Sequence, residues 1–288
     1  MIAGELTVGR RAAAWIVEHA SYFTSRDDRR REPQLVGLAE LGLFIFLSAR
    51  AAADAADVES ARAVLASAFD EAAFAEAVRE DRRLLASWLT VLIGLDERAR
   101  AKSGAREIVL GPNAFATEQY PHRVLETIWA AEKLGWHSPF APAAREVYGT
   151  TFLARPHDLA TALPADTYAV THTVGYLTDF GARVLLDDAA AQRHAEAVVR
   201  RLLDRALEWE HYDLVAELLA ALRWLGSTRD DLQSVAWERL AAQQLPSGAV
   251  VSFPAGPGLL AELAAGDVGS IFGLVCHPTL VTALAEVS

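Results

Sequence analysis

The stretch from Ala165 to Gly181 places more reactive side chains on one expected helix than any other window of the chain. An α-helix has 3.6 residues per turn, so side chains three or four positions apart lie above one another. That spacing aligns two phenols, an imidazole and a carboxylate: Tyr168, His172, Tyr176 and Asp179. The residues around this line are mostly apolar, which predicts a largely buried helix. Buried polar groups need partners or a wet cavity, so we expect a functional site here.

Among these residues, His172 is the first candidate for a catalytic role. An unperturbed imidazole has a pKa of about 6.5, which suits proton transfer at neutral pH. Asp179 lies about 10 Å away along the helix axis, so a carboxylate on a neighbouring helix is an equally good partner for His172. The opposing interpretation is that His172 is a hydrogen-bonded core residue without a catalytic role.

Other expected helices carry comparable polar stripes. Asp213 and Glu217 lie one turn apart and repel each other unless a cation or a shared proton relieves them. His122 and Glu126 have the same spacing, which also suits simple helix stabilisation. Pro278 removes a helical hydrogen bond directly after His277 and predicts a kink there.

From these stripes we assign two groups of site residues. The expected catalytic residues are His172, Asp179, His277, Asp213 and Glu217. The expected substrate-binding residues are Tyr168, Tyr176, His122, Glu126, Trp129 and Trp224. The remaining histidines lie in polar surroundings and are expected at the surface: His19, His137, His157 and His194.

The elements that must position these residues are helices. The chain has 288 residues, 52% of them hydrophobic, and no stretch shows the strict alternation of branched residues that marks a strand. We expect one all-α domain over residues 1–288. Expected helical segments before the repeats are 5–23, 34–53 and two helices within 59–97, followed by an irregular loop over 101–121.

The part from residue 121 to 288 is repetitive. Three helices are expected to end in an apolar residue and a glycine, at Gly135, Gly181 and Gly226, which are 46 and 45 positions apart. Glycine commonly occupies the left-handed position after a helix, and this period is the length of an αα-hairpin. More polar, outer helices are expected between them, and an apolar inner helix is expected at the end: 143–153, 189–208, 230–244 and 267–287.

One segment resembles a known architecture. The sequence Gln244-Leu-Pro-Ser-Gly248-Ala-Val250 resembles the repeat ending Gln, three residues, Gly, one residue, Trp of triterpene cyclases and other α/α-toroid proteins. It departs from that pattern at Val250. The resemblance implies an (α/α) toroid or barrel. The segment 168–181 and the sequence His277-Pro-Thr-Leu-Val also resemble actinobacterial proteins encoded near natural-product genes, which implies specialised metabolism without naming a reaction.

Charge and cysteine content restrict the partners. A formal net charge of -11 argues against nucleic acid and anionic membranes, which need a basic surface. The single cysteine, Cys276, excludes an intramolecular disulfide and suits a reducing compartment. The N-terminal residues lack the pattern of a secretory signal, and the apolar run 35–47 is too short and too charged to span a bilayer. We expect a cytoplasmic protein.

No cofactor is expected. The alternative is zinc held by Cys276, His277 and a distant His172 or Asp213. Cys276-His277 resembles the adjacent Cys-His pair of the lanthionine cyclases, but the chain lacks a second cysteine and a glycine after His277. The sequence also lacks the motifs of nucleotide enzymes and serine hydrolases.

Two functions from different classes remain. The first is a biosynthetic enzyme of specialised metabolism, a cyclase, isomerase or lyase that uses general acid–base chemistry in a central cavity. The second is a non-catalytic helical-repeat module that binds a peptide or a hydrophobic small molecule. The enzyme needs a His–carboxylate pair at an open pocket, whereas the polar groups of the binding module should be hydrogen-bonded to one another.

Overall fold

The structure is a computed structural model that describes residues 7–24, 31–51, 55–95, 97–116, 118–155 and 158–287. Every regular element in these ranges is a helix, apart from one isolated antiparallel bridge between Gln244 and Val250. The prediction of an all-helical protein is therefore confirmed for the described part of the chain. The sequence predicts one domain, and the structure groups the chain into two compact units. We call them the terminal unit (residues 1–19 and 156–288) and the middle unit (residues 20–155).

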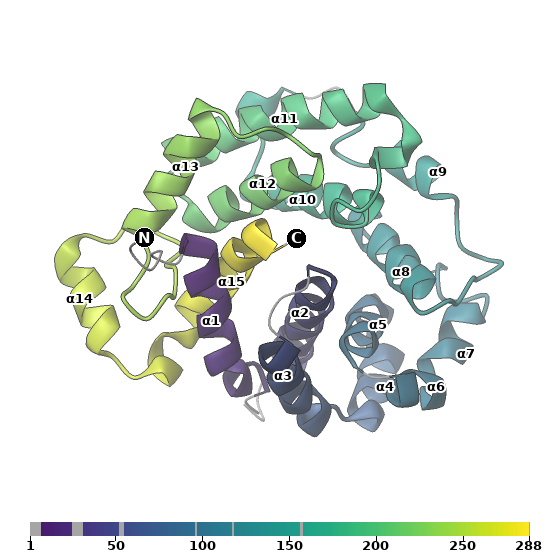
Figure 1. Ribbon diagram of the computed structural model, residues 1–288. Helices are drawn as coiled ribbons and strands as arrows, with labels where there is room; N and C mark the ends of the chain where they lie inside the picture. Colours follow the sequence, from purple (N-terminus) through teal and green to yellow (C-terminus); the bar gives the residue numbers. More distant parts are fainter. Residues whose placement is uncertain are drawn as a thin grey trace. The chain divides into compact units, whose positions relative to one another are not determined.

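The terminal unit is built around a helix that is buried along almost its whole length, α12 (Figure 1). Its sequence, YDLVAELLAALRW, is apolar on most sides, and it packs against α10, α11 and α15. In contrast, α11 buries one stripe of small and aliphatic residues and exposes the rest. The helices of this unit are α1 (Val8–Glu18), α10 (Pro164–Thr178), α11 (Ala189–Glu208), α12 (Tyr212–Trp224), α13 (Asp231–Ala242), α14 (Pro257–Ala265) and α15 (Val268–Val287), with 3₁₀ turns η3 (Leu159–Thr161) and η4 (Leu185–Asp187).

Capping residues explain where the outer helices begin. The Asp188 side chain accepts hydrogen bonds from two backbone N–H groups of the first turn of α11, and Asp230 accepts one at the start of α13. These bonds satisfy donors that have no partner inside the helix. The expected helix 189–208 therefore matches α11, and the expected helix 230–244 matches α13 to within two residues at either end.

The three predicted glycine caps are confirmed. Gly135, Gly181 and Gly226 have φ values of 72°, 85° and 70°. After α12, the backbone N–H of Ser227 donates to the carbonyl of Leu222 and that of Gly226 to Arg223, which closes the helix with a left-handed residue.

The end of α10 differs from the expected stripe. Thr178 is its last residue, and Asp179, Phe180 and Gly181 all have positive φ. The N–H of Phe180 turns back to the carbonyl of Gly175. Asp179 is therefore a left-handed cap residue and does not continue the helical line from Tyr168, so its expected position was wrong.

A turn after α13 attaches the first helix to the last part of the chain. The Gln244 side-chain amide donates to the carbonyls of Val8 (2.9 Å) and Gly248 (2.8 Å). Gly248 has a φ of 101°, and a Cβ there would lie 2.4 Å from the carbonyl oxygen of Arg11. Only glycine fits this approach, which holds α1 where it packs along α15 (Figure 1).

The helix α15 continues through Pro278. By length and composition, its span Val268–Glu286 could cross a membrane, and 56% of that span is buried inside the unit. Buried core helices satisfy the same two criteria.

The middle unit is centred on a fully buried helix, α5, which packs along α2. Gly94 makes this packing close, because a Cβ there would lie 2.6 Å from the Cα of Gly42. The elements of the unit are η1 (Ala20–Thr24), α2 (Arg31–Arg50), α3 (Ala55–Ala68), α4 (Glu71–Glu80), η2 (Arg82–Leu84), α5 (Leu85–Gly94), α6 (Glu97–Lys102), α7 (Ala105–Leu110), α8 (Pro121–Lys133) and α9 (Ala144–Tyr148).

Several expected boundaries were wrong. The first helix ends at Glu18 and is followed by a 3₁₀ turn, whereas one helix was expected over 5–23. The region 101–121, expected as a loop, contains the short helix α7. The helix expected over 143–153 is the five-residue α9. Helix α14 was not expected at all.

Candidate active site

Asp213 is the centre of a polar cluster in the terminal unit. It lies in the first turn of α12, where the positive end of the helix dipole stabilises a carboxylate. His211 precedes the helix, and its Nδ1 accepts a hydrogen bond from the backbone N–H of Leu214. Asp213 is only 6% exposed, so a charge there must be paired.

Side chains from two other helices pair with Asp213. The Tyr168 hydroxyl of α10 donates to Oδ2 of Asp213. His277 of α15 places its Nδ1 2.7 Å from Oδ1. Burial raises the pKa of the Asp213 carboxyl, but the hydrogen bond and charge of His277 and the hydrogen bond from Tyr168 outweigh it and bring the pKa below the ordinary value. Asp213 is therefore an anion at neutral pH.

Tyr168 shows the complementary effect. Burial and the neighbouring Asp213 charge raise the pKa of the phenol far above its ordinary value. Tyr168 therefore remains a neutral donor to Asp213 at neutral pH.

Glu217 adds a second carboxylate on the opposite side of the imidazole. It is one turn after Asp213 on α12 and 3% exposed. Its Oε1 lies 3.6 Å from Nε2 of His277, which is longer than a hydrogen bond. The His277 side chain itself is 31% exposed. A solvent-accessible imidazole thus lies between two buried carboxylates, and we call Tyr168, Asp213, Glu217 and His277 the His277 cluster.

The stripe on α10 is an aromatic ladder. The rings of Tyr168 and His172 are 6.4 Å apart and those of His172 and Tyr176 6.1 Å apart, both roughly parallel. The Tyr168 ring also meets His277 edge to face at 6.1 Å. His172 therefore borders the cluster through Tyr168, and Asp213 contacts Tyr168 and His277.

The ladder continues into the core beyond His172. Tyr176 contacts Phe180, and Phe180 meets the Trp224 ring edge to face at 4.9 Å. Trp224 is 5% exposed and lies so close to α10 that a Cβ on Gly175 would be 3.1 Å from it. Tyr176 and Trp224, expected to bind substrate, are thus packing residues in this structure. Asp179, in its left-handed cap, is 8% exposed.

Three predicted site residues belong to the middle unit. Glu126 of α8 forms an ion pair with Arg123 at 2.7 Å, in place of the expected pair with His122. Burial and the charge of Arg123 lower the pKa of His122 to about 4. Trp129 is 1% exposed and packs edge to face on Phe46.

The remaining histidines follow the surface prediction in part. His137 and His194 are exposed. His19 is half-buried and stacks on Trp15, with ring centroids 4.6 Å apart. Its Nδ1 also forms a hydrogen bond with the backbone carbonyl of Trp15, so the surface prediction was wrong for this residue. His157 lies outside the described residues.

Within the described ranges, no three His, Cys, Asp or Glu side chains are arranged to hold a metal ion. Cys276, the single cysteine of the chain, is half-buried and directly precedes His277 in the sequence.

The pairing of Tyr168 with Asp213 has a signal in the sequence that helical spacing within one helix does not reveal. The two residues are 45 positions apart, which is the spacing of Gly181 and Gly226. They therefore occupy equivalent positions in two successive hairpins, and equivalent positions on neighbouring inner helices lie side by side.

Fold and site together define an all-helical protein with a histidine between two buried carboxylates. Residues 9–287 match the family model DUF6895, described as a domain of unknown function, and the chain belongs to this family. No curated protein and no solved structure matches the chain.

Proposed function

We propose that the His277 cluster is the active site of an enzyme that uses general acid–base chemistry. The observation that carries the proposal is a partly exposed imidazole held between the buried carboxylates of Asp213 and Glu217. Each nitrogen of the ring faces a carboxylate, and the ring is accessible to a ligand. Positioned acid–base groups of this kind typically contribute about 10²–10⁴-fold to a rate.

The hydrogen-bond geometry assigns a role to each group. Asp213 is an acceptor, so Nδ1 of His277 carries a proton and Asp213 fixes the orientation of the ring. Nε2 is then the atom that exchanges a proton with substrate. The 3.6 Å gap to Glu217 is too long for a direct hydrogen bond. A substrate atom that approaches Nε2 would therefore meet Glu217 as a second proton acceptor.

Such a pair suits reactions that add a proton at one atom and remove one at another. Cyclases, isomerases and lyases share this requirement, and the half-buried rings of Tyr168 and His172 lie beside His277, where they could contact a substrate. We propose a small-molecule or peptide substrate with an apolar part. We propose a role in specialised metabolism because of the natural-product resemblance of the sequence, and a cytoplasmic location because a single cysteine suits a reducing compartment.

We further propose that the hairpins are repeats of an α/α toroid or barrel. Support comes from the terminal unit, where the buried helices α10 and α12 alternate along the chain with the amphipathic α11 and α13. The glycine caps at intervals of 46 and 45 residues support the same repeat.

A non-catalytic binding module is the second candidate function. It is favoured by one observation, namely that Tyr168, Asp213 and His277 already satisfy one another by hydrogen bonds. A purely structural or binding cluster would have this property.

Proton exchange distinguishes the two candidates. The parent protein and a His277→Gln variant are incubated in D₂O with a cell extract of small molecules, and deuterium uptake and product formation are followed by mass spectrometry. An enzyme should deuterate or convert at least one compound, and the variant should lose this activity by about 10²-fold or more.

A matched control is His194→Gln, which alters an exposed histidine on α11. It should retain full activity. Conversion that survives in folded His277→Gln protein, or its absence with the parent protein, would instead favour the binding module.

A further inference from the structure

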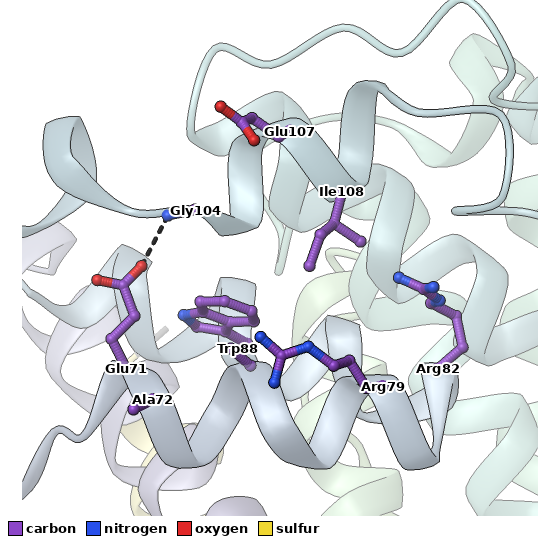
Figure 2. A pocket seen from close by; sticks show the side chains of 9 residues that line it. Glu71, Ala72, Arg79, Arg82, Trp88, Gly104, Glu107 and Ile108 are labelled. Carbon is purple, nitrogen blue, oxygen red and sulfur yellow. Dashed lines mark hydrogen bonds between the residues drawn. The ribbon is translucent and has the colours of Figure 1, made fainter.

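A groove in the middle unit forms a second candidate site, independent of the His277 cluster. It encloses about 620 Å³, within the range of small-ligand pockets. Its lining includes Trp88, Ile108, two glutamates and two arginines (Figure 2). The residues come from α4, η2, α5 and the start of α7.

Trp88 provides a buried hydrogen-bond donor in this groove. The residue is 1% exposed, and its indole Nε1 has no hydrogen-bond partner among the described residues. An unpartnered buried N–H costs free energy, so an acceptor supplied by a ligand would be favoured at this point. The indole also stacks on the ring of Phe74, with ring centroids 6.1 Å apart, which holds it in place.

The charges of the groove are separated. In Figure 2, Glu71 lies on the side of the indole nitrogen, whereas Arg79 and Arg82 lie on the opposite side of the ring. One oxygen of Glu71 accepts the backbone N–H of Gly104 at 2.7 Å, which fixes the carboxylate. Glu107 lies above it on α7. The groove therefore offers an acidic end and a basic end with an apolar floor between them.

The spacing of these ends sets the length of a ligand. The backbone positions of Glu71 and Arg79, eight residues apart on α4, are about 12 Å apart along the axis. In Figure 2 the Arg79 side chain turns back from its position towards the indole, so this value is an upper limit for the separation of the two charged groups. An extended peptide advances about 3.3–3.6 Å per residue. A peptide of up to three or four residues, with a free ammonium at one end and a free carboxylate at the other, would fit within this limit.

We propose that the groove binds a short peptide with both termini free. The ammonium faces Glu71 and Glu107, the carboxylate faces Arg79 and Arg82, and a backbone carbonyl accepts the indole N–H of Trp88. A peptide supplies all three features at the required spacing, whereas a simple anion satisfies the basic end alone.

Isothermal titration calorimetry with tetra-alanine tests the proposal. The full-length protein should bind tetra-alanine saturably, and N-acetylation or C-terminal amidation should each weaken binding by about tenfold or more, since each removes one charge-assisted contact. Equal binding of the acetylated peptide, or no binding of tetra-alanine, would overturn the proposal.

Two variants distinguish the loss of a contact in the groove from a general effect on folding. Trp88→Phe keeps an aromatic side chain and removes the donor, so it should weaken tetra-alanine binding several-fold. The phenyl ring is smaller than the indole, so some stability should be lost as well, and circular dichroism shows whether the variant is folded under the conditions of the titration. Arg79→Gln should weaken binding by about tenfold. Arg83→Gln is the matched control, because Arg83 is paired with Asp81 and does not line the groove. Unchanged binding in the first two variants, or an equal loss in the control, would contradict the assignment.

Discussion

Asp213 is a buried carboxylate that keeps its charge through the donors around it. The lowered pKa means that its contribution to stability is present above the unfolded-state value of about 3.9 and is lost as the pH falls through the folded value. Tyr168 supplies one of these donors.

Tyr168→Phe should therefore destabilise the protein. We expect a cost of about 1–3 kcal/mol at pH 7, because one oxygen of a buried carboxylate loses its donor. Urea unfolding followed by circular dichroism measures this cost, which should shrink in acid once Asp213 is protonated. The control, Tyr120→Phe, alters a 71% exposed residue and should stay within about 0.5 kcal/mol of the parent.

His122 gives a second, separate pH dependence. Burial and the neighbouring Arg123 lower its pKa from 6.5 to about 4. Between these values the unfolded chain binds a proton that the folded protein does not, so stability falls as the pH is lowered from 6.5 to 4. The loss should be about 2–3 kcal/mol.

His122→Gln should flatten this part of the stability profile. The measurement is the free energy of unfolding in urea at several values between pH 4 and 7, with His194→Gln, an exposed histidine, as control. A variant with the same slope as the parent would show that His122 is not the group responsible.

The sequence could predict the residues of the cluster but not their pairing. Asp213, Glu217, His277 and Tyr168 all stand out as polar groups on apolar helices. Asp213 pairs with Tyr168 and His277 on two other helices, whereas helical spacing suggested pairs within one helix, such as His122 with Glu126. Helical spacing specifies which side chains share a face of one helix, whereas contacts between helices depend on the packing of the fold.

At the scale of the helix, the glycine caps divide into two kinds. A Cβ on Gly135 or Gly226 meets no atom within 4 Å. The stability lost on replacing either glycine by alanine therefore arises from the backbone conformation alone. At Gly181 a Cβ would also lie 3.3 Å from the Cα of Trp224, a backbone atom that cannot move away alone.

We therefore expect Gly181→Ala to cost more than Gly135→Ala or Gly226→Ala. The latter two should each lose about 1 kcal/mol, from the left-handed φ alone. Urea midpoints of the three variants test the order. Equal midpoints for all three would show that the contact with Trp224 is relieved at no cost.

Helix ends could be predicted well where a local signal exists. Asp188, Asp230 and the glycines mark them by side-chain or backbone chemistry that acts within a few residues. The short α7 and the exposed α14 were missed, although a glycine follows each of them and Pro257 begins α14, because neither buries the extended apolar stripe by which helices are recognised. The left-handed Asp179 and Phe180 were missed because residues other than glycine rarely adopt this conformation.

At the scale of the molecule, the terminal unit joins the two ends of the chain. Trp15 of α1 is 1% exposed and stacks on Phe272 of α15, with ring centroids 5.9 Å apart. The contact is long-range in sequence, and no local pattern in the sequence indicates it.

Trp15→Ala should loosen α15 as well as α1. We expect a loss of about 3–5 kcal/mol, as for other large buried aromatic residues, and faster amide exchange over residues 268–287 in hydrogen–deuterium exchange. Trp209→Ala, at a residue that is 38% exposed, is the control. Unchanged exchange in α15 of the Trp15 variant would mean that α15 is held by its other neighbours.

Because α1 packs on α15, it cannot make its native contacts until the last part of the chain has been synthesised. Glu18 and Val268 are separated by 250 positions, and ribosomes add about 5–20 residues per second. The apolar face of α1 therefore emerges roughly 10–50 s before its partner exists. Throughout that interval Trp15 and Ile16 have no native contact on α15. The nascent chain therefore exposes apolar side chains that are prone to aggregation. A chaperone that shields this helix should raise the yield of folded protein most when translation is slow.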